Sequence, residues 1–542
     1  MAGLQARYFT QVRRQKPVCG AGGADRGADR AIAAYAGGMS VSSPAQAWQG
    51  AESLVASGDF AAARAAYEGL LDDPELAPMA QLRLSLVASA QGRYRDAVDA
   101  ALAAFALRRP QPQLLELLAK RLFSLGEREA ALACATDPAL LQSGPGPLLA
   151  GLGKIVLDRG FPAQALPLLR RARELGVRNP RIGLQVGLAL LQLGDTGAAR
   201  RELQACLVQQ PGMPRALAAL GEAGLGGETL VAQLRASLQA HGDQDPDAPL
   251  LHYSLFAELD ALGKAEPAWD ALDAGMRLRW KQVHYDPDEV QELFEHLRTV
   301  RAAAPAREDG DPGTPRPVFI VGMPRSGADE LRALLARHPG VTDAGELRDL
   351  VWQLRYLCNQ DGGSQLDMTL ARGAESIDFA ELGRRYLAHT RWRAQARPVY
   401  LDAMPGNFAL VSYIVRSLPQ ARILHMVRAP MATCFLNLAT WYPRLHPHSY
   451  DQGEMADQYR RYRTLMAHWR ALYPDRVLDV RHDELVAEPE VVVREVLAVC
   501  GLPVDPAATP PGLPAVGASE PQWRRYEQHL GRLREHLGAL AY

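Results

Sequence analysis

Glycines recur every 34 residues in the first half of the chain, and this period limits the possible fold more than any other feature. The five glycines are Gly58, Gly92, Gly126, Gly160 and Gly194. Alanine stands five positions after each of them, at Ala63, Ala97, Ala131, Ala165 and Ala199. A regular period of this length indicates repeated helix pairs, in which glycine forms the turn and alanine allows two helices to approach closely. We therefore predict an all-α solenoid over residues 45–280.

The period resembles that of tetratricopeptide repeat (TPR) proteins. Phe60 and Tyr94 fit the aromatic position after the turn, and Pro211 fits the closing proline. A later copy at Gly263 and Ala268 falls one residue beyond two further periods. The repeated glycines and alanines only pack helix on helix. The resemblance implies a concave surface that binds a protein or peptide, and the period does not reveal its contact residues.

Length and charge exclude several classes of protein. A chain of 542 residues is long enough for at least two domains. Its 60 Lys and Arg against 61 Asp and Glu argue against a protein that coats nucleic acid. No run of eighteen apolar residues occurs, so we expect no membrane span. The six cysteines are scattered without a CxxC pair, which favours reduced thiols and a cytoplasmic protein.

Composition also suggests the limits of the domains. Residues 1–44 are predicted to form a disordered segment, because residues 18–39 are rich in Gly, Ala, Asp and Arg. The segment lacks the apolar core of a secretory signal, and Met39 is an alternative start. Residues 281–315 are predicted to hold a helix and a linker rich in Pro, Gly and charge, so that a second domain occupies residues 316–542.

The second half alternates between strand and helix patterns. Short apolar runs occur at Val318–Val321, Val399–Leu401, Ile423–Val427 and Val477–Val480. Segments with helical spacing lie between them, at 378–392, 407–417 and 453–471. This alternation predicts an α/β domain with a parallel sheet, whose ligands lie at the carboxyl ends of the strands.

The first of these runs leads into a loop suited to binding phosphate. The run ends at Gly322, a short loop extends to Gly327, and Leu331, Leu334 and Leu335 then follow at helical spacing. A helix that begins after such a loop presents free N–H groups and its positive dipole end to an anion. The loop lacks the Lys-Ser/Thr ending of nucleotide-triphosphate loops, which disfavours a kinase or GTPase.

Several motifs of the second half together resemble the bacterial TPR-sulfotransferases, which are related to tyrosylprotein sulfotransferases. In chain order they are PVFIVGMPRSG, AGEL, YLDAMPGNF, LPQARILHMVRAP, VRHDELVAEPEVVVREVLAVCGLP and WRRYEQHL. The resemblance implies a P-loop-type α/β sulfotransferase domain. It also implies transfer of a sulfuryl group, without a metal, from 3′-phosphoadenosine 5′-phosphosulfate (PAPS) to a hydroxyl or amine. The acceptor would be a peptide, a protein or another molecule, recruited partly by the TPR array.

The resemblance assigns roles to individual residues. Gly322, Arg325, Ser326 and Gly327 match the loop that holds the 5′-phosphosulfate, and Arg325 would grip this group with its planar fork of donors. Glu346 falls where relatives place the glutamate that removes the acceptor's proton. Taken alone, a glutamate at the start of a helix is more often a favourable partner of the helix dipole.

Two further positions belong to the implied nucleotide site. Arg428 matches the arginine that binds the 3′-phosphate. A basic residue at the end of a buried strand can also simply mark the point where the chain reaches solvent. His482 stands where relatives have a tyrosine. Asp402 and Asn407 are interpreted as structural residues of the turn after their strand.

The chain departs from the family pattern at several positions of the donor site. Ala328 and Asp329 replace two hydroxyl residues, Ala403 replaces a lysine, and Leu436 replaces a serine that Asn437 would substitute in part. If Asp329 and the phosphate lay about 4 Å apart, their repulsion would be roughly 4 kcal/mol at an effective dielectric of about 20, unless the side chain turns away. Loss of the lysine removes a cation from the transition state.

These departures leave an alternative open. The chain is either an active sulfotransferase or a catalytically impaired sulfotransferase-fold protein that acts as a TPR scaffold for protein binding. Compensation for the missing cations would come from Arg332, Arg348, Arg444 or His482.

Overall fold

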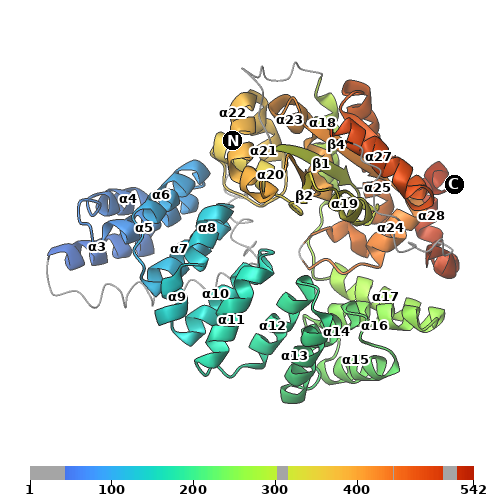
Figure 1. Ribbon diagram of the computed structural model, residues 1–542, viewed down its shortest axis with the longest axis horizontal. Coiled ribbons are helices and arrows are strands. Elements are labelled where there is room, and N and C mark those ends of the chain that lie inside the picture. The colour runs from blue at the N-terminus through green and yellow to red at the C-terminus, as the bar shows by residue number, and fades with distance from the viewer. Residues whose placement is uncertain (1–42, 302–314, 444, 504–521) are drawn as a thin grey trace. The chain divides into compact units, whose positions relative to one another are not determined.

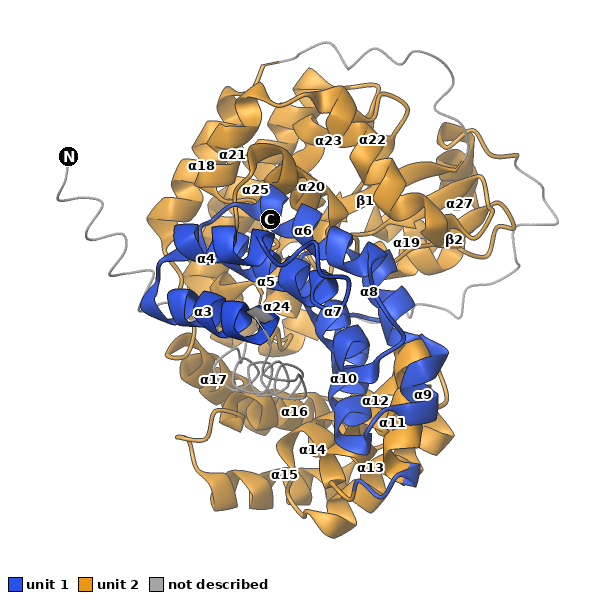
Figure 2. Ribbon diagram, turned by 90° about the vertical axis from the view of Figure 1, so that its left-hand side faces the viewer, with its two compact units in different colours: residues 1–160, 174–177 blue, residues 161–173, 178–542 orange. Residues whose placement is uncertain are grey.

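The computed structural model describes residues 43–301, 315–443, 445–503 and 522–542. Residues 1–42 of the predicted disordered segment 1–44 and residues 302–314 of the predicted helix and linker 281–315 lie outside this range, and Ser43 and Pro44 are the first residues of a helix. The chain divides into two compact units, one of residues 1–160 with 174–177 and one of residues 161–173 with 178–542 (Figure 2). The predicted domain limits stay predictions.

The described part of the first unit is helical. Its helices are α3 (Ser43–Ser57), α4 (Phe60–Glu68), α5 (Ala77–Ala90), α6 (Tyr94–Ala106), α7 (Pro112–Ser124), α8 (Arg128–Ala135), α9 (Pro138–Ser143) and α10 (Gly146–Asp158). The second unit begins with further helices of the same kind (Figure 1). These are α11 (Pro162–Glu174), α12 (Pro180–Gln192), α13 (Thr196–Gln209), α14 (Pro214–Glu222), α15 (Glu228–His241), α16 (Ala248–Ala261), α17 (Ala265–Trp280) and α18 (Pro287–Thr299).

The repeat predicted from the glycine period is confirmed. The five periodic glycines each lie between two helices and have φ angles from 73° to 84°, a left-handed conformation that L side chains rarely adopt. Each of the five periodic alanines is fully buried. The Asp59 and Asp195 side chains, one position after their glycines, accept hydrogen bonds from Ala62 N and Ala198 N and so cap the next helix.

The second half contains a parallel sheet of five strands, as the apolar runs predict. The strands are β1 (Arg316–Gly322), β2 (Val341–Asp343), β3 (Val399–Asp402), β4 (Arg422–Val427) and β5 (Val477–Arg481), in the order β2-β3-β1-β4-β5. All neighbours run parallel, with Phe319 opposite Asp402 and Gly322 opposite Met426. The sequence interpretation missed β2, because three residues carry too little pattern to be recognised.

Helices and short 3₁₀ segments connect the strands. They are α19 (Ala328–Leu335), α20 (Asp349–Cys358), α21 (Met368–Gly373), η1 (Ala374–Ser376), α22 (Phe379–Thr390), η2 (Arg391–Ala394), η3 (Pro405–Leu410), α23 (Val411–Ser417), α24 (Pro430–Leu438), η4 (Pro447–Tyr450), α25 (Gln452–Leu472), α26 (His482–Ala487) and α27 (Pro489–Val499). The chain closes with η5 (Gln522–His529), α28 (Gly531–Leu537) and η6 (Gly538–Ala541). Within the described residues, no helix is long and apolar enough to cross a membrane.

The sheet is buried on both faces. Val318 and Ile320 of β1 point to one face, where they share a core with residues of α19 and α27. Phe319 and Val321 alternate to the other face, whose core is shared by α20, α22, α23 and α25. This second core continues into α12–α17, so the last helices of the repeat array and the sheet domain share one apolar interior.

A buried carboxylate joins α16 to the C-terminal segment η5. Asp260 is 8% exposed, and its carboxylate accepts hydrogen bonds from Gln522 Nε2 at 2.7 Å and from the Tyr526 hydroxyl. Arg525 lies 2.9 Å from the same carboxylate in an ion pair. Trp269 of α17 stacks on His529, with ring centroids 4.7 Å apart. Polar and aromatic contacts therefore fix the end of the array to the domain.

Replacing this carboxylate tests the junction. Asp260→Ala leaves the buried Tyr526 hydroxyl without its acceptor, and we expect the free energy of unfolding of the second unit to fall by about 3 kcal/mol. Glu228→Ala, which breaks the exposed ion pair of Glu228 with Lys264, is the control and should cost at most about 1 kcal/mol. Chemical denaturation followed by tryptophan fluorescence measures both. Equal losses in the two variants would contradict the role given to Asp260.

Candidate active site

Residues of β4 and α26 pack closely against the loop between β1 and α19. Gly322 has φ 150°, and a Cβ there would lie 2.9 Å from the carbonyl oxygen of Met426 on β4. Gly327 has φ 109°, and a Cβ there would overlap Cδ2 of His482. Arg325 between them also has a positive φ, 65°. The ends of β1 and β4 and the start of α26 therefore meet around this loop, as predicted for the carboxyl ends of parallel strands.

Side chains of α24 and of the residue just after β4 hold two carbonyl groups of the loop. Asn437 Nδ2 donates to the carbonyl of Pro324 at 2.7 Å, and Arg428 Nη1 donates to the carbonyl of Arg325 at 3.3 Å. The Asn437 amide is fully used, because Nδ2 also donates to the Thr433 carbonyl and Oδ1 accepts from the Tyr442 hydroxyl. The hypothesis that Asn437 substitutes for the missing phosphate-binding serine is therefore wrong: it fastens the loop.

Two buried polar atoms at the loop lack partners among the described residues. They are the hydroxyl oxygen of Ser326 and Nε2 of His482. A buried polar group without a hydrogen bond costs about 1–3 kcal/mol, so such groups are rare unless a ligand completes them. The first helical bond of α19 runs from Leu331 N to the Gly327 carbonyl, which leaves the preceding N–H groups without helical partners. An anion would satisfy both kinds of donor.

Two arginines, Arg325 and Arg428, lie near these groups. Burial lowers the pKa of Arg428, and the nearby charge of Arg325 lowers it further, while Glu330 opposes the shift. Burial likewise lowers the pKa of His482, with a second contribution from the charge of Arg428. His482 is therefore mostly neutral at pH 7, and a bound anion would favour its protonated form.

The Asp329 carboxylate, the main objection to an anion here, is turned away from the loop. Its Oδ1 lies 3.2 Å from Arg332 Nη2, and the side chain is 69% exposed. Arg332 also pairs with Asp343 on β2, with Nε to Oδ2 at 3.1 Å. The two ion pairs hold Asp329 at the surface, so the repulsion calculated for a 4 Å approach does not apply. They also leave Arg332 unsuited to replace a missing cation.

Glu346 follows β2 in a segment that β3 holds in place. The Ala403 N–H donates to the Gly345 carbonyl at 2.9 Å, and the Leu347 N–H donates to Asp402 Oδ1 at 3.2 Å. Asp402 is fully buried and also accepts hydrogen bonds from the Tyr386 hydroxyl and the Met404 N–H. Asp402 thus fixes the backbone beside Glu346.

The surroundings of Glu346 make its carboxylate a stronger base. The protein around the carboxylate raises its pKa by desolvation, Arg348 and Arg332 oppose the shift, and Asp329 adds to it. Tyr442, whose pKa burial raises, interacts electrostatically with both Arg325 and Glu346. Arg325 and Glu346, two candidate site residues, are therefore both close enough to Tyr442 to interact with it.

Two other positions offer no replacement for the groups that relatives carry. Ala403 is 3% exposed and packs in the apolar core beside Leu401 and Met426. Leu436 is half-buried on α24 and has no polar side-chain atom. Arg444 lies outside the described residues. Among the described residues, Arg325, Arg348 and Arg428 interact electrostatically with groups of the predicted site.

Comparison with known proteins identifies the domain. The model of the sulfotransferase family matches residues 317–506, the span of all five strands after the first residue of β1. Residues 317–506 form a domain of the sulfotransferase family. The helical repeat region resembling TPR proteins precedes these residues.

Two curated relatives match the sulfotransferase-family chain over part of their length. An uncharacterized protein of Aquifex aeolicus is 25% identical over 294 residues, 49% of this chain and 38% of that protein. A protein-tyrosine sulfotransferase of Drosophila melanogaster is 25% identical over 199 residues, 34% of this chain and 38% of that protein. The chain therefore spans well under half the length of each relative.

Solved structures resemble each half at low identity. A sulfotransferase from Alicyclobacillus acidocaldarius is 18% identical with a TM-score of 0.27, and the match covers 42% of this chain and 96% of that one. A tetratricopeptide repeat protein from Parabacteroides merdae is 14% identical with a TM-score of 0.32, covering 46% of this chain and 96% of that one.

The ion pair between Asp329 and Arg332 can be tested with adenosine 3′,5′-bisphosphate (PAP), the desulfated form of the implied donor. Arg332→Leu releases the carboxylate near the loop, and we expect calorimetry to show about tenfold weaker binding. Adding Asp329→Asn to that variant should restore the affinity, whereas Asp329→Asn alone should change it less than about threefold. A gain of more than about a hundredfold from Asp329→Asn alone would show that the carboxylate opposes the ligand in the native protein.

The burial of Asp402 predicts a dependence of stability on pH. Burial raises the pKa of this carboxyl to about 7 from 3.8, so between these values the folded state holds a proton that the unfolded state has lost. Stability conferred by that proton is complete below the unfolded pKa and is lost as pH rises toward 7. Relative to wild type, Asp402→Asn should therefore gain about 2–4 kcal/mol in free energy of unfolding between pH 4.5 and 7.5. Chemical denaturation at both pH values measures this, and a constant difference would contradict it.

Proposed function

We propose that the sulfotransferase-family domain transfers a sulfuryl group from PAPS to a hydroxyl or amine of a peptide, protein or other acceptor. The observation that carries this proposal is the pair of buried, unpartnered atoms at the glycine-bounded loop, Ser326 Oγ and His482 Nε2. Both face a site with two nearby arginines, and the carboxylate of Asp329 is paired elsewhere. These features fit an anionic ligand.

The residues have separate roles in this proposal. The 5′-phosphosulfate end is bound by Arg325, by Ser326 and by backbone N–H groups at the start of α19. These N–H groups belong to Gly327, Ala328 and Asp329. Arg428 binds the 3′-phosphate, and His482 donates to the nucleotide when protonated. PAPS supplies the activated sulfuryl group. Glu346 takes the proton of the acceptor, since its raised pKa makes it a better base, and Arg325 stabilises negative charge that develops beside it.

The repeat region would present the acceptor. The relative from Drosophila melanogaster is named a protein-tyrosine sulfotransferase, which supports a protein or peptide acceptor here. Because α16 and α17 are fixed to the domain, an acceptor bound to them would be held at a set distance from the site. Free, buried thiols at Cys134, Cys434 and Cys500 support a reducing, cytoplasmic location.

A second candidate function is a TPR scaffold whose sulfotransferase domain no longer transfers sulfate. The specific observation in its favour is the burial of Ala403 in the apolar core, where relatives carry a lysine. Leu436 likewise offers no hydroxyl to the 3′-phosphate. Under this alternative the protein binds nucleotide weakly and serves only to bind partners.

Binding and turnover together separate the two functions. We expect wild type to bind PAP, and Arg325→Ala to weaken binding about 10- to 100-fold through loss of charge-assisted hydrogen bonds. The control is Arg337→Ala, an exposed arginine just beyond α19. With labelled PAPS and candidate acceptors, Glu346→Gln should leave PAP binding intact and lower turnover about 10²- to 10⁴-fold.

Two other outcomes would contradict the proposed enzyme. A wild type that fails to bind PAP would overturn the proposed enzyme. Binding without turnover, with turnover appearing only in Ala403→Lys, would establish the impaired scaffold instead.

A further inference from the structure

A cavity of about 220 Å³ lies in the second unit, beside the segment that carries Glu346. Its walls come from η3, η4, α18, α20, α25 and the segment that follows α20. Apolar side chains form most of the lining, among them Phe294, Val351, Leu366 and Phe408. A site lined in this way suits an apolar group about the size of one ring, since an engineered cavity of roughly 150 Å³ already binds benzene.

Three buried polar atoms in this lining have no hydrogen-bond partner among the described residues. They are Nδ2 of Asn407, Nε2 of His448 and Oε1 of Gln458. The three residues are 2%, 7% and 8% exposed, so water reaches them poorly. Together they provide an amide donor, an amide acceptor and an imidazole nitrogen. Three such atoms around one cavity indicate a ligand that brings a hydrogen-bonding group of its own.

The cavity is connected to the candidate active site through Arg348. This residue lines the cavity, stands two positions after Glu346, and donates to the Ser364 hydroxyl at 3.1 Å. Its charge lowers the pKa of Glu346, against the desolvation by surrounding protein that raises it. It also lowers the pKa of His446, another lining residue, which burial brings to about 4. One arginine therefore lies between the base and the cavity.

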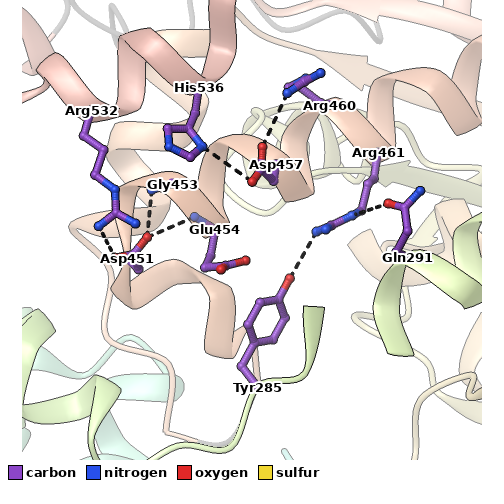
Figure 3. Close-up of polar contacts among 10 residues, drawn as sticks. All are labelled: Tyr285, Gln291, Asp451, Gly453, Glu454, Asp457, Arg460, Arg461, Arg532 and His536. Carbon is purple, nitrogen blue, oxygen red and sulfur yellow. Dashed lines mark hydrogen bonds and ion pairs between the residues drawn. The ribbon is translucent and has the colours of Figure 1, made fainter. Parts of the chain in front are cut away.

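One wall of the cavity comes from outside residues 317–506. Tyr285, Val290, Leu293 and Phe294 belong to α18 and the turn before it. Figure 3 shows how this wall is held: Arg461 of α25 donates from Nε to Gln291 Oε1 at 2.8 Å and from Nη1 to the Tyr285 hydroxyl at 3.3 Å. Gln458 lies one turn before Arg461 on the same helix. It lines the same cavity as Tyr285, whose side chain Arg461 holds in place.

Hydrogen bonds also hold a second wall of the cavity. The buried guanidinium of Arg355 donates to the carbonyls of Gly363 and Gln365 and to the Asp367 carboxylate. These bonds fix the segment whose residues Ser364, Gln365 and Leu366 line the cavity. Both walls are therefore fixed before any ligand binds, which reduces the entropy lost on binding.

We propose that this cavity binds a neutral aromatic group of the acceptor that carries a hydrogen-bonding substituent, distinct from the hydroxyl or amine that reacts. This inference rests on the proposed function, which places the acceptor's reacting group at Glu346. A neutral group fits because, among the described lining residues, Arg348 is the one with a permanent charge, and burying a further charge here would be costly. The wall formed by α18 makes acceptor choice depend on residues outside the family domain.

Two small probes of the same shape test the cavity, namely p-cresol and toluene. In titrations of the full chain followed by ligand-observed NMR, we expect p-cresol to bind about five- to tenfold more tightly than toluene, because its hydroxyl satisfies the unpartnered atoms. Gln458→Met removes the amide acceptor at similar size, and the preference should fall to about twofold or less. Leu293→Trp fills the cavity and should abolish binding of both probes.

Gln452→Met is the matched control on the same helix. Gln452 is fully engaged, donating to the His529 carbonyl and accepting from the Leu533 N–H. This variant should lower the midpoint of thermal unfolding and leave the probe preference unchanged, whereas Gln458→Met should not lower the midpoint. Equal binding of the two probes to wild type, or no binding of either, would overturn the inference.

PAP binding, measured separately, keeps this test independent of the proposed function. Gln458→Met and Leu293→Trp should leave the affinity for PAP unchanged. Probe binding with no PAP binding would reject the donor site and retain an aromatic pocket. PAP binding without probe selectivity would reject the pocket and retain the donor site.

Discussion

The buried carboxylate of Asp402 is the interaction on which the candidate active site depends. It ends β3 and receives the Leu347 and Met404 N–H groups and the Tyr386 hydroxyl. These donors come from the segment of Glu346, from the turn after β3, and from α22. One side chain therefore sets the relative positions of the base, the neighbouring strand end and the helix behind them. A buried group with this many bonds is hard to replace, because each partner would lose its acceptor.

The features predicted from sequence are those with a local cause. A left-handed turn strongly favours glycine, so Gly58 and its repeats mark the recurring turn within the helix pairs. Runs such as Val318–Val321 predict buried strands because their apolar residues cover both faces of a sheet. Both predictions are confirmed. The short strand β2 was missed because its three residues form a strand only through pairing with β3.

Other features of the site depend on partners that only the fold brings close. The Asp329 side chain turns away from the loop, the exception that the sequence left open, because Arg332 lies three positions later on the same helix. Its position is set by Arg332, which Asp343 of the unpredicted strand also holds. Asn437 was mistaken for a phosphate ligand because the carbonyl of Pro324 that it binds lies 113 positions away. The pairings of Arg332 with Asp343 and of Asn437 with Pro324 exist only after the strands are assembled, and neither composition nor spacing encodes them.

The attachment of α16 and α17 through Asp260 and Trp269 has a consequence for how a bound chain would be used. A flexible tether gives a captured segment an effective concentration that falls as the tether lengthens. A rigid attachment instead favours one spacing along the captured segment and excludes others. Selection would then operate on the distance between two points of a partner as well as on its local sequence.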